Sequence, residues 1–229
     1  MSLFQRWTFD SAAGGLIHDS GPNAFTGTLS GTNIPTVVVG PPGTNIPHAL
    51  HFDGTGYVIG SAGSGFHALP NSAFAVSVWF RTSIPPIARQ TFIFSRPALS
   101  WLEVYQSVAP GNLSYAGPGF QLTTTPTVVV QNVWVHLFLQ RNAIGVGSAW
   151  ANGVPVAVFG VNSATWTENP TESAVLGCRT DATLTTFSQF LTGDLADLRV
   201  YDNVDWTNRQ IADIYMSSFL QNPLQLVAD

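Results

Sequence analysis

Glycine and proline interrupt this chain at short intervals along its whole length. The 229 residues include 21 glycines and 15 prolines, and strand-like runs rich in apolar residues lie between them. Short strands separated by turn residues are typical of an all-β sandwich or barrel. The sequence therefore predicts an all-β fold, and periodicity alone leaves sandwich and barrel open.

Three segments carry the clearest strand patterns. F-A-V-S-V-W-F-R at 74–81 alternates apolar with mostly small or polar residues, which predicts a half-buried strand. W-V-H-L-F-L-Q-R at 134–141 is apolar on both faces and predicts a central strand. Asn152-Gly153 separates two further runs, and this pair favours a type I′ hairpin turn because both residues tolerate positive φ.

The end of the chain combines a strand with a helix signal. Residues 195–201 read as a strand, and Thr207 with Gln210 then forms the pattern of a capping box. Apolar residues follow at helical spacing, so we expect one short helix. Residues 220–229 form a tail without a pattern, and 82–119 is rich in proline and aromatics, which predicts long loops. Because no shift in composition marks a linker, residues 1–229 are expected to form one domain.

The composition excludes several classes of partner. Charged residues make up 9% of the chain and hydrophobic residues 45%; there is no lysine, and the net charge is −5. Without a basic stripe we expect no nucleic-acid binding, and without a long apolar run or basic amphipathic helix we expect no membrane association. The low charge content predicts that some apolar surface is buried against a partner.

The single cysteine and the first residues bear on where the chain is made. Cys178 has no partner within the chain, so it is expected to be a free thiol buried in a strand. L-F-Q-R-W-T-F-D at 3–10 lacks the basic start, apolar run and cleavage site of a signal peptide. We therefore expect synthesis in a cytoplasm.

Several short fragments follow one another along almost the whole chain. They are W-T-F-D at 7–10, H-D-S-G-P-N at 18–23, F-D-G at 52–54, W-V-H at 134–136, W-A-N-G at 150–153 and D-L-R-V-Y at 197–201. In their order and spacing, these fragments resemble the laminin-G-like domains of the concanavalin A-like lectin/glucanase superfamily.

The resemblance implies a two-sheet antiparallel jelly-roll sandwich with one short C-terminal helix. Hydrolases of this superfamily carry a Glu-x-Asp-x-x-Glu pattern on one strand, where paired carboxylates serve as acid and nucleophile. The three glutamates here, Glu103, Glu168 and Glu172, do not stand in that pattern. We therefore expect a protein that is not an enzyme.

The resemblance also suggests a structural calcium ion, because many relatives bind one. Asp19, Asn23 and Asp197 match the positions that would supply oxygen ligands, and calcium takes six to eight of them. The alternative is that Asp19 makes an Asx-turn and that Asp197 pairs with Arg199. Both interpretations stay open at this point.

Four aromatic residues are candidates for contact with a ligand or partner. They stand in irregular stretches of sequence, where an exposed ring can stack on a sugar or pack against a protein neighbour. They are Trp101, Tyr105, Tyr115 and Trp166. In contrast, Trp7, Trp79 and Trp134 stand in strand patterns and are expected to pack in the core or on a sheet face.

Two functions from different classes follow. The first is a non-enzymatic structural protein: an oligomeric surface accessory of a phage or virus particle, made in the host cytoplasm and bound on the virion to neighbouring protein subunits. Stand-alone laminin-G-like chains resemble such decoration and tail-associated proteins. The alternative is a lectin-like carbohydrate-binding or adhesion module, with an extracellular location.

Overall fold

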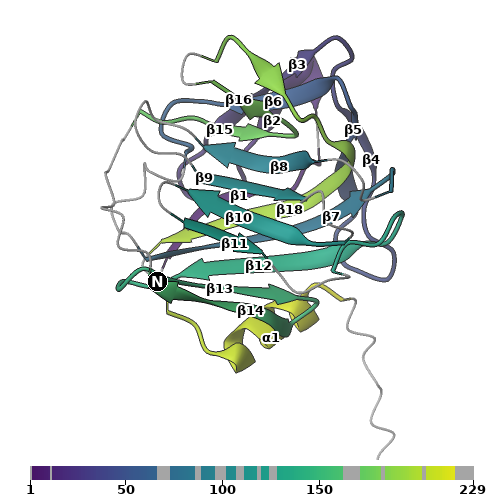
Figure 1. Ribbon diagram of the computed structural model, residues 1–229. Helices are drawn as coiled ribbons and strands as arrows, with labels where there is room; N and C mark the ends of the chain where they lie inside the picture. The colour runs from purple at the N-terminus through teal and green to yellow at the C-terminus, as the bar shows by residue number, and fades with distance from the viewer. Residues whose placement is uncertain are drawn as a thin grey trace, which may run out of the picture.

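The computed structural model describes most of the chain as two antiparallel sheets packed face to face (Figure 1). The described residues are 2–10, 12–65, 73–85, 89–95, 102–106, 111–117, 120–123, 128–161, 171–181, 184–202 and 205–219. Trp101, Trp166 and the tail at 220–229 lie outside them. The predicted jelly-roll sandwich with one short C-terminal α-helix is confirmed.

Sheet A contains eight strands among the described residues. Seven follow one another across the sheet, and β1 (Ser2–Trp7) also pairs with β18. The seven, in spatial order, are β14 (Val154–Val161), β13 (Val146–Ala151), β12 (Val135–Arg141), β7 (Phe74–Thr82), β18 (Thr192–Asp202), β5 (His48–Asp53) and β4 (Thr36–Val39).

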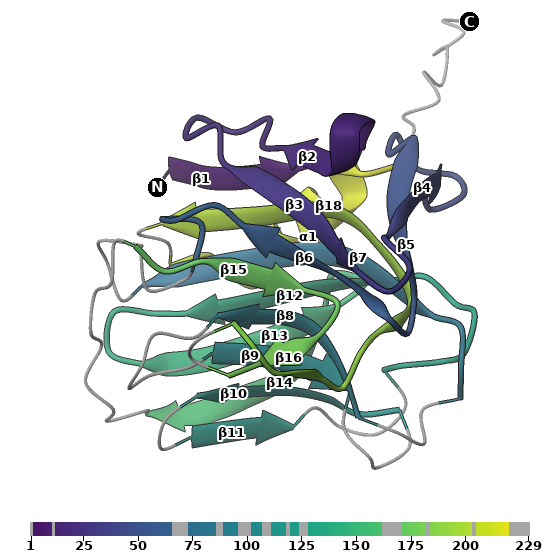
Figure 2. The ribbon, with the colours of Figure 1, turned by 90° about the horizontal axis from the view of Figure 1, so that it is seen from above.

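Sheet B likewise contains eight strands in the part of the chain that is described. In spatial order they are β11 (Phe120–Thr123), β10 (Leu113–Gly117), β9 (Leu102–Gln106), β8 (Gln90–Ser95), β15 (Ala174–Leu176), β6 (Gly56–Gly60), β3 (Thr26–Gly31) and β2 (Leu16–His18). A third, two-stranded sheet is formed by β16 (Arg179–Thr180) and β17 (Phe187–Ser188). A 3₁₀ turn, η1 (Ala13–Gly15), precedes β2. Figure 2 shows the strands from above.

The segment 82–119 contradicts the prediction of long loops. Strands β8, β9 and β10 all lie in it and form adjacent strands of sheet B. Buried Glu103 and Gln106 on β9 replace the apolar residues that mark a strand in sequence. Their backbone is nevertheless paired, so the alternation that sequence analysis depends on is absent although the strand is present.

The core between the sheets is aromatic. Trp7, Phe52, Phe80 and Phe92 are fully buried, and the rings of Phe80 and Phe92 stack across the two sheets at 4.7 Å between centroids. Burial of each such side chain contributes about 1.5–3 kcal/mol. Cys178 is a buried free thiol as predicted, but it lies in the bend between β15 and β16 and not in a strand; burial raises the pKa of its thiol to about 12.

Two local predictions from the sequence, the hairpin turn and the helix capping box, are confirmed. Asn152 and Gly153 have φ of 51° and 75° and join β13 to β14, which confirms the hairpin. Thr207 and Gln210 form the predicted capping box at the start of α1 (Asn208–Ser217). No helix in the described residues has the length and apolar character that crossing a membrane requires.

Helix α1 packs on the face of sheet A that points away from the core, here called the outer face. Ile211 joins Phe138 and Trp150 in one cluster, and Tyr215 joins Trp79 in another. Strand β7 is therefore buried on both faces over most of its length, whereas its sequence predicts a half-buried strand. The helix comes from a distant part of the chain, so the strand's own pattern does not reveal the second layer.

His136 is enclosed in this second layer. Its Nε2 lies 2.8 Å from the Ser77 hydroxyl, and its ring contacts those of Trp79 and Tyr215, which also contact each other. Burial, followed by the nearby charge of Arg199, lowers the pKa of His136 from 6.5 to about 3. Between about pH 3 and pH 6.5, His136 is therefore neutral in the native protein, whereas it is protonated in the unfolded chain.

This difference predicts a loss of stability in acid. Above pH 6.5 neither state binds the proton, so the contribution is intact; it falls as pH drops from about 6.5 towards 3. At pH 4.5 the loss is about 3 kcal/mol, from two pH units at about 1.4 kcal/mol each. Urea denaturation from pH 7 to 4.5 should show a shallower decline in the free energy of unfolding for His136→Gln than for the wild type. Equal slopes for His136→Gln and wild type would contradict the assignment.

Candidate functional site

Two strands meet end to end along one edge of β18. The last residue of β1, Trp7, pairs with Leu198, and near the start of β5, Leu50 pairs with Leu195. Between these two pairs, neither β1 nor β5 pairs with β18 in the described residues. On the opposite edge of β18, the pairing with β7 shifts register between Ala196 and Arg199. An opening therefore forms in sheet A where β1 ends and β5 begins.

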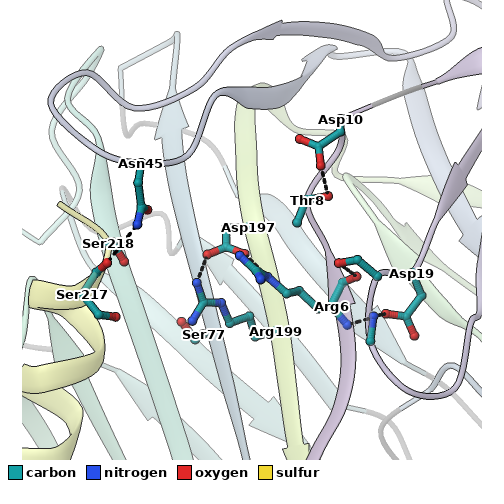
Figure 3. Close-up of polar contacts among 12 residues, drawn as sticks. Arg6, Thr8, Asp10, Asp19, Asn45, Ser77, Asp197, Arg199, Ser217 and Ser218 are labelled. Atoms are coloured by element: carbon teal, nitrogen blue, oxygen red, sulfur yellow. Dashed lines mark hydrogen bonds and ion pairs between the residues drawn. The ribbon is translucent and has the colours of Figure 1, made fainter. Parts of the chain in front are cut away.

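A cleft of about 340 Å³ occupies this opening (Figure 3). This volume lies near the lower end of the range of about 300–1,000 Å³ typical of small-ligand sites. Six of its eight lining residues are polar, and they come from β1, the loops that follow it, the β4–β5 loop and β18. The lining consists of Arg6, Thr8, Asp10, Ser20, Asn45, Ile46, Pro47 and Asp197.

Asp197 forms the charged floor of the cleft. It is 2% exposed and adopts a φ of 45° at the bulge in β18. Its Oδ1 accepts a hydrogen bond from Arg6 Nε at 2.9 Å, and its Oδ2 accepts one from Arg199 Nη2. Two guanidinium groups thus compensate one buried carboxylate and hold it in place.

Asp19 fixes Arg6 from the other side. Its Oδ1 accepts hydrogen bonds from the backbone N–H groups of Arg6 and Gly21, each at 2.6 Å. The bond to Gly21 is the Asx-turn that was one alternative for this residue. Asn23 donates its amide to the carbonyl oxygen of Phe4 at 2.7 Å. Both loop residues therefore fasten β1, and through it the guanidinium of Arg6.

The rim of the cleft is more exposed. Asp10 accepts a hydrogen bond from the hydroxyl of Thr8 at 2.6 Å and lies 3.1 Å from His48 Nδ1. The Thr8 hydroxyl and the adjacent His48 outweigh partial burial and lower the pKa of Asp10. On the opposite rim, Asn45 donates its side-chain amide to the carbonyl of Ser217, so the β4–β5 loop is tied to the end of α1.

The three residues predicted to bind calcium are brought near one another but do not face a common point. Asp19 and Asp197 present their oxygens to N–H groups of Arg6 and its neighbours, and Asn23 presents its amide to Phe4. In the described residues, no three His, Cys, Asp or Glu side chains are grouped as metal ligands. A cation would have to displace the guanidinium of Arg6, so this arrangement does not fit the ion. The calcium site stays a prediction.

Of the four predicted contact aromatics, only Tyr105 and Tyr115 belong to the described residues. Tyr105 and Tyr115 lie on the paired strands β9 and β10 rather than in loops. Tyr105 is 3% exposed, and the guanidinium of Arg89 covers its ring at 3.7 Å. It therefore offers no open face to a sugar. Trp101 and Trp166 fall outside the described residues, so their role stays a prediction.

Sequence analysis missed most of the cleft. Arg6 and Asn45 belong to no motif, and Thr8 stands in the W-T-F-D fragment without marking a site; the pairing of β1 and β5 with one strand is what assembles them. One signal was available: in a chain with so few charges, an arginine or aspartate inside a strand pattern is unusual and requires a partner. Asp197, Arg199 and Arg6 all satisfy that description.

Comparison with known proteins agrees with this architecture. A family model described as the concanavalin A-like lectin/glucanases superfamily matches residues 52–212, well over half of the chain. The chain belongs to the concanavalin A-like lectin/glucanase superfamily. The predicted resemblance is thereby confirmed. No curated protein sequence matches the chain.

Solved structures show the same fold for this superfamily member at low sequence identity. Domain 4 of AbnA, a GH43 extracellular arabinanase from Geobacillus stearothermophilus in complex with arabinotriose, has 18% identity and a TM-score of 0.67, over 93% of this chain and 98% of that one. The binding domain of botulinum neurotoxin DC in complex with rat synaptotagmin II has 13% identity and a TM-score of 0.71, over 96% of this chain and 52% of that one. The present chain thus spans about half of the neurotoxin structure.

The ion pairs at Asp197 predict a large effect of neutralising it. Asp197→Asn retains a residue that tolerates positive φ but leaves two guanidiniums facing a neutral amide. Removal of one partner from a buried pair typically costs about 3–5 kcal/mol, so we expect a loss of that order in the free energy of unfolding in urea. Asp10→Asn, at 56% side-chain exposure, is the matched control and should change stability by less than about 1 kcal/mol. A loss of similar size in both variants would contradict the buried-pair account.

The arrangement of Arg6 also predicts the response to calcium. Because its guanidinium lies against Asp197, addition of calcium or of a chelator should leave the thermal unfolding midpoint of the protein unchanged. Differential scanning calorimetry with about 5 mM calcium chloride or about 5 mM EDTA tests this. A rise of several degrees with calcium that is absent in Asp197→Asn would establish the metal site instead.

Proposed function

We propose that this protein is a non-catalytic binding module whose cleft at the junction of β1, β5 and β18 takes a hydroxyl-rich ligand, such as a terminal unit of a glycan. The observation that carries the proposal is the guanidinium of Arg6, held by Asp197 in the wall of a polar cleft of about 340 Å³. Its side chain is 37% exposed, and its terminal N–H groups have no acceptor among the described residues.

The cleft combines donors with acceptors. Arg6 supplies N–H groups, whereas Asp10 supplies a carboxylate and Asn45 an amide oxygen that accepts no hydrogen bond within the described part of the chain. A sugar hydroxyl both donates and accepts, so it can pair with both kinds of group at once. Because Asp10 and Asp197 offset the positive charge of the arginines, the cleft does not favour an anion.

The same geometry argues against catalysis. Glycoside hydrolysis needs one carboxyl group that can donate a proton and a second that acts as nucleophile or base. Both oxygens of Asp197 accept N–H bonds from arginine, and the lowered pKa of Asp10 keeps that group ionised. Neither carboxylate of the cleft is arranged to protonate a leaving group.

Similar structures support a binding role by analogy of fold. The arabinanase domain is described in complex with arabinotriose. Another similar structure is of botulinum neurotoxin type C, whose cell entry is described as dependent on interaction with two ganglioside molecules. It has 13% identity and a TM-score of 0.67, over 94% of this chain and 51% of that one. A fold hosts many functions, so the argument rests on the cleft and the analogy adds to it.

The role in a virus or phage particle stays a prediction of the sequence. It requires apolar surface for contact with neighbouring subunits, and several large apolar side chains are at least 46% exposed: Ile34, Val39, Val130, Val133, Ile144, Val154 and Met216. An accessory protein of such a particle can also carry a glycan site, so the two functions are compatible. Light scattering of the purified chain separates them: a multimer supports assembly, and a monomer that binds glycans supports the module alone.

Arg6→Lys tests the cleft directly. Lysine retains a positive charge for Asp197 but loses the planar fork of N–H donors. We expect affinity for a glycan captured from an array of neutral and acidic glycans to fall about tenfold or more, because hydrogen bonds to a charged group contribute about 1.5–3 kcal/mol. Isothermal titration calorimetry with the selected glycan measures the change.

The matched control is Arg209→Lys, which alters an exposed arginine on α1 outside the cleft lining. It should bind as the wild type does. Equal affinity of Arg6→Lys and wild type, with both folded by circular dichroism, would overturn the assignment of the cleft. Binding of no glycan at all by a multimeric chain would favour the assembly function.

A further inference from the structure

A second group of polar side chains crosses sheet A on its outer face. Cross-strand pairing places Thr36 opposite His51, His51 opposite Asp194, and Asp194 opposite Arg81. The guanidinium of Arg81 then lies over the ring of Trp134, 5.1 Å from its centroid. These five residues, called the outer row, come from β4, β5, β18, β7 and the residue before β12, which are neighbours in this order.

The centre of the outer row is a buried carboxylate. Asp194 is fully buried; its Oδ1 lies 2.8 Å from His51 Nδ1, and its Oδ2 accepts a hydrogen bond from Nε of Arg81 at 2.7 Å and forms an ion pair with Nη2 of the same residue at 2.7 Å. Replacement of a buried ion pair by apolar residues is often neutral for stability, so stability alone does not explain the group. What it does achieve is a fixed orientation of Arg81 and His51, whose side chains are 35% and 38% exposed.

The positioned groups present both donors and an acceptor. Arg81 retains terminal N–H groups beyond its bonds to Asp194. Nδ1 of His51 faces Asp194, so Nε2 faces away from it; in the tautomer that carries its proton on Nδ1, Nε2 is an acceptor. Thr36 adds an exposed hydroxyl at one end, and partly buried Trp134 beside exposed Val133 adds apolar surface at the other.

Most of the outer row is open because the second layer stops one residue short of it, and only Trp134 packs against that layer. The next positions along the same face, Ala49, Ala196 and Trp79, are buried with Ile46 in one cluster, against which the partly buried rings of Tyr215 and Phe219 pack. That cluster also separates the outer row from the cleft, since Ile46 belongs to the cleft lining. Across five strands at about 4.8 Å spacing the row is about 19 Å long, which is longer than one sugar ring.

We propose that the outer row is a second binding site, for an extended neutral oligosaccharide whose adjacent hydroxyls pair with Arg81, His51 and Thr36. Donors and an acceptor side by side match a pair of neighbouring hydroxyls. The carboxylate of Asp194 offsets the charge of Arg81, which removes the preference for an acidic ligand. This site shares no residue with the cleft, so it does not depend on the function proposed there.

The test uses the full chain labelled with ¹⁵N and four neutral hexasaccharides, derived from cellulose, xylan, arabinan and galactan. In heteronuclear NMR, one of them should shift the indole signal of Trp134 and the imidazole signals of His51. Arg81→Lys retains the charge facing Asp194 but loses the planar fork, so it should weaken that binding at least tenfold. Thr36→Val, which removes only an exposed hydroxyl, should weaken it about two- to fivefold.

The outcomes separate the two sites. Shifts at His51 and Trp134 that Arg81→Lys weakens and Arg6→Lys does not would establish the outer row. Shifts confined to Arg6, Asn45 and Asp197 would overturn the outer row and leave the cleft as a binding site. Shifts confined to the residues of the outer row would instead count against the cleft. Unchanged affinity in a folded Arg81→Lys variant, no shifts at millimolar hexasaccharide, or tighter binding of hexagalacturonate than of every neutral probe would each overturn the proposal.

Discussion

The bulge at Asp197 determines how the cleft and the outer row are built. Strand β18 is central to sheet A and pairs with β7 along its length, with β1 at one end and with β5 at the other. A non-glycine residue with positive φ is uncommon in a strand and requires support from its surroundings. Arg6 and Arg199 supply that support by binding both oxygens of the Asp197 carboxylate. Because Arg6 lies on β1, the same contact joins the first strand of the chain to the last.

Sequence analysis succeeded where structure is encoded by neighbouring residues. The Asn152-Gly153 turn and the Thr207 capping box depend on two to four consecutive residues, and both formed as expected. The resemblance to a known superfamily supplied the jelly roll, which periodicity had left open between sandwich and barrel. Strand β9 was missed because a charged residue, Glu103, is buried in it, and Glu103 is stabilised by Thr91 of β8 and by Arg89, which precedes β8. That stabilisation is invisible in the segment itself.

The candidate site was predictable in part and for a physical reason. Sequence comparison drew attention to Asp19 and Asp197, and both are structurally decisive, but their partners are N–H groups of Arg6 and its neighbours. A carboxylate matched by position says nothing of what its oxygens face, since that depends on a residue nearly two hundred positions away. The rows of residues across a sheet depend on register in the same way, which is why neither the cleft nor the outer row was found from the sequence.

One displacement of register accounts for the placement of both buried aspartates. In a regular strand, residues three apart point to opposite faces, so Asp194 and Asp197 should lie on opposite sides of sheet A. Leu195 and Leu198 both face the core, and the register shift between Ala196 and Arg199 is what allows this. The extra residue is Asp197, which stays with Asp194 outside the core. Without the bulge, Leu198 and Val200 would face α1, and a charged residue would enter the aromatic core. The bulge therefore keeps the core apolar and, by the same step, gives the outer face two carboxylates, each held by an arginine from a neighbouring strand.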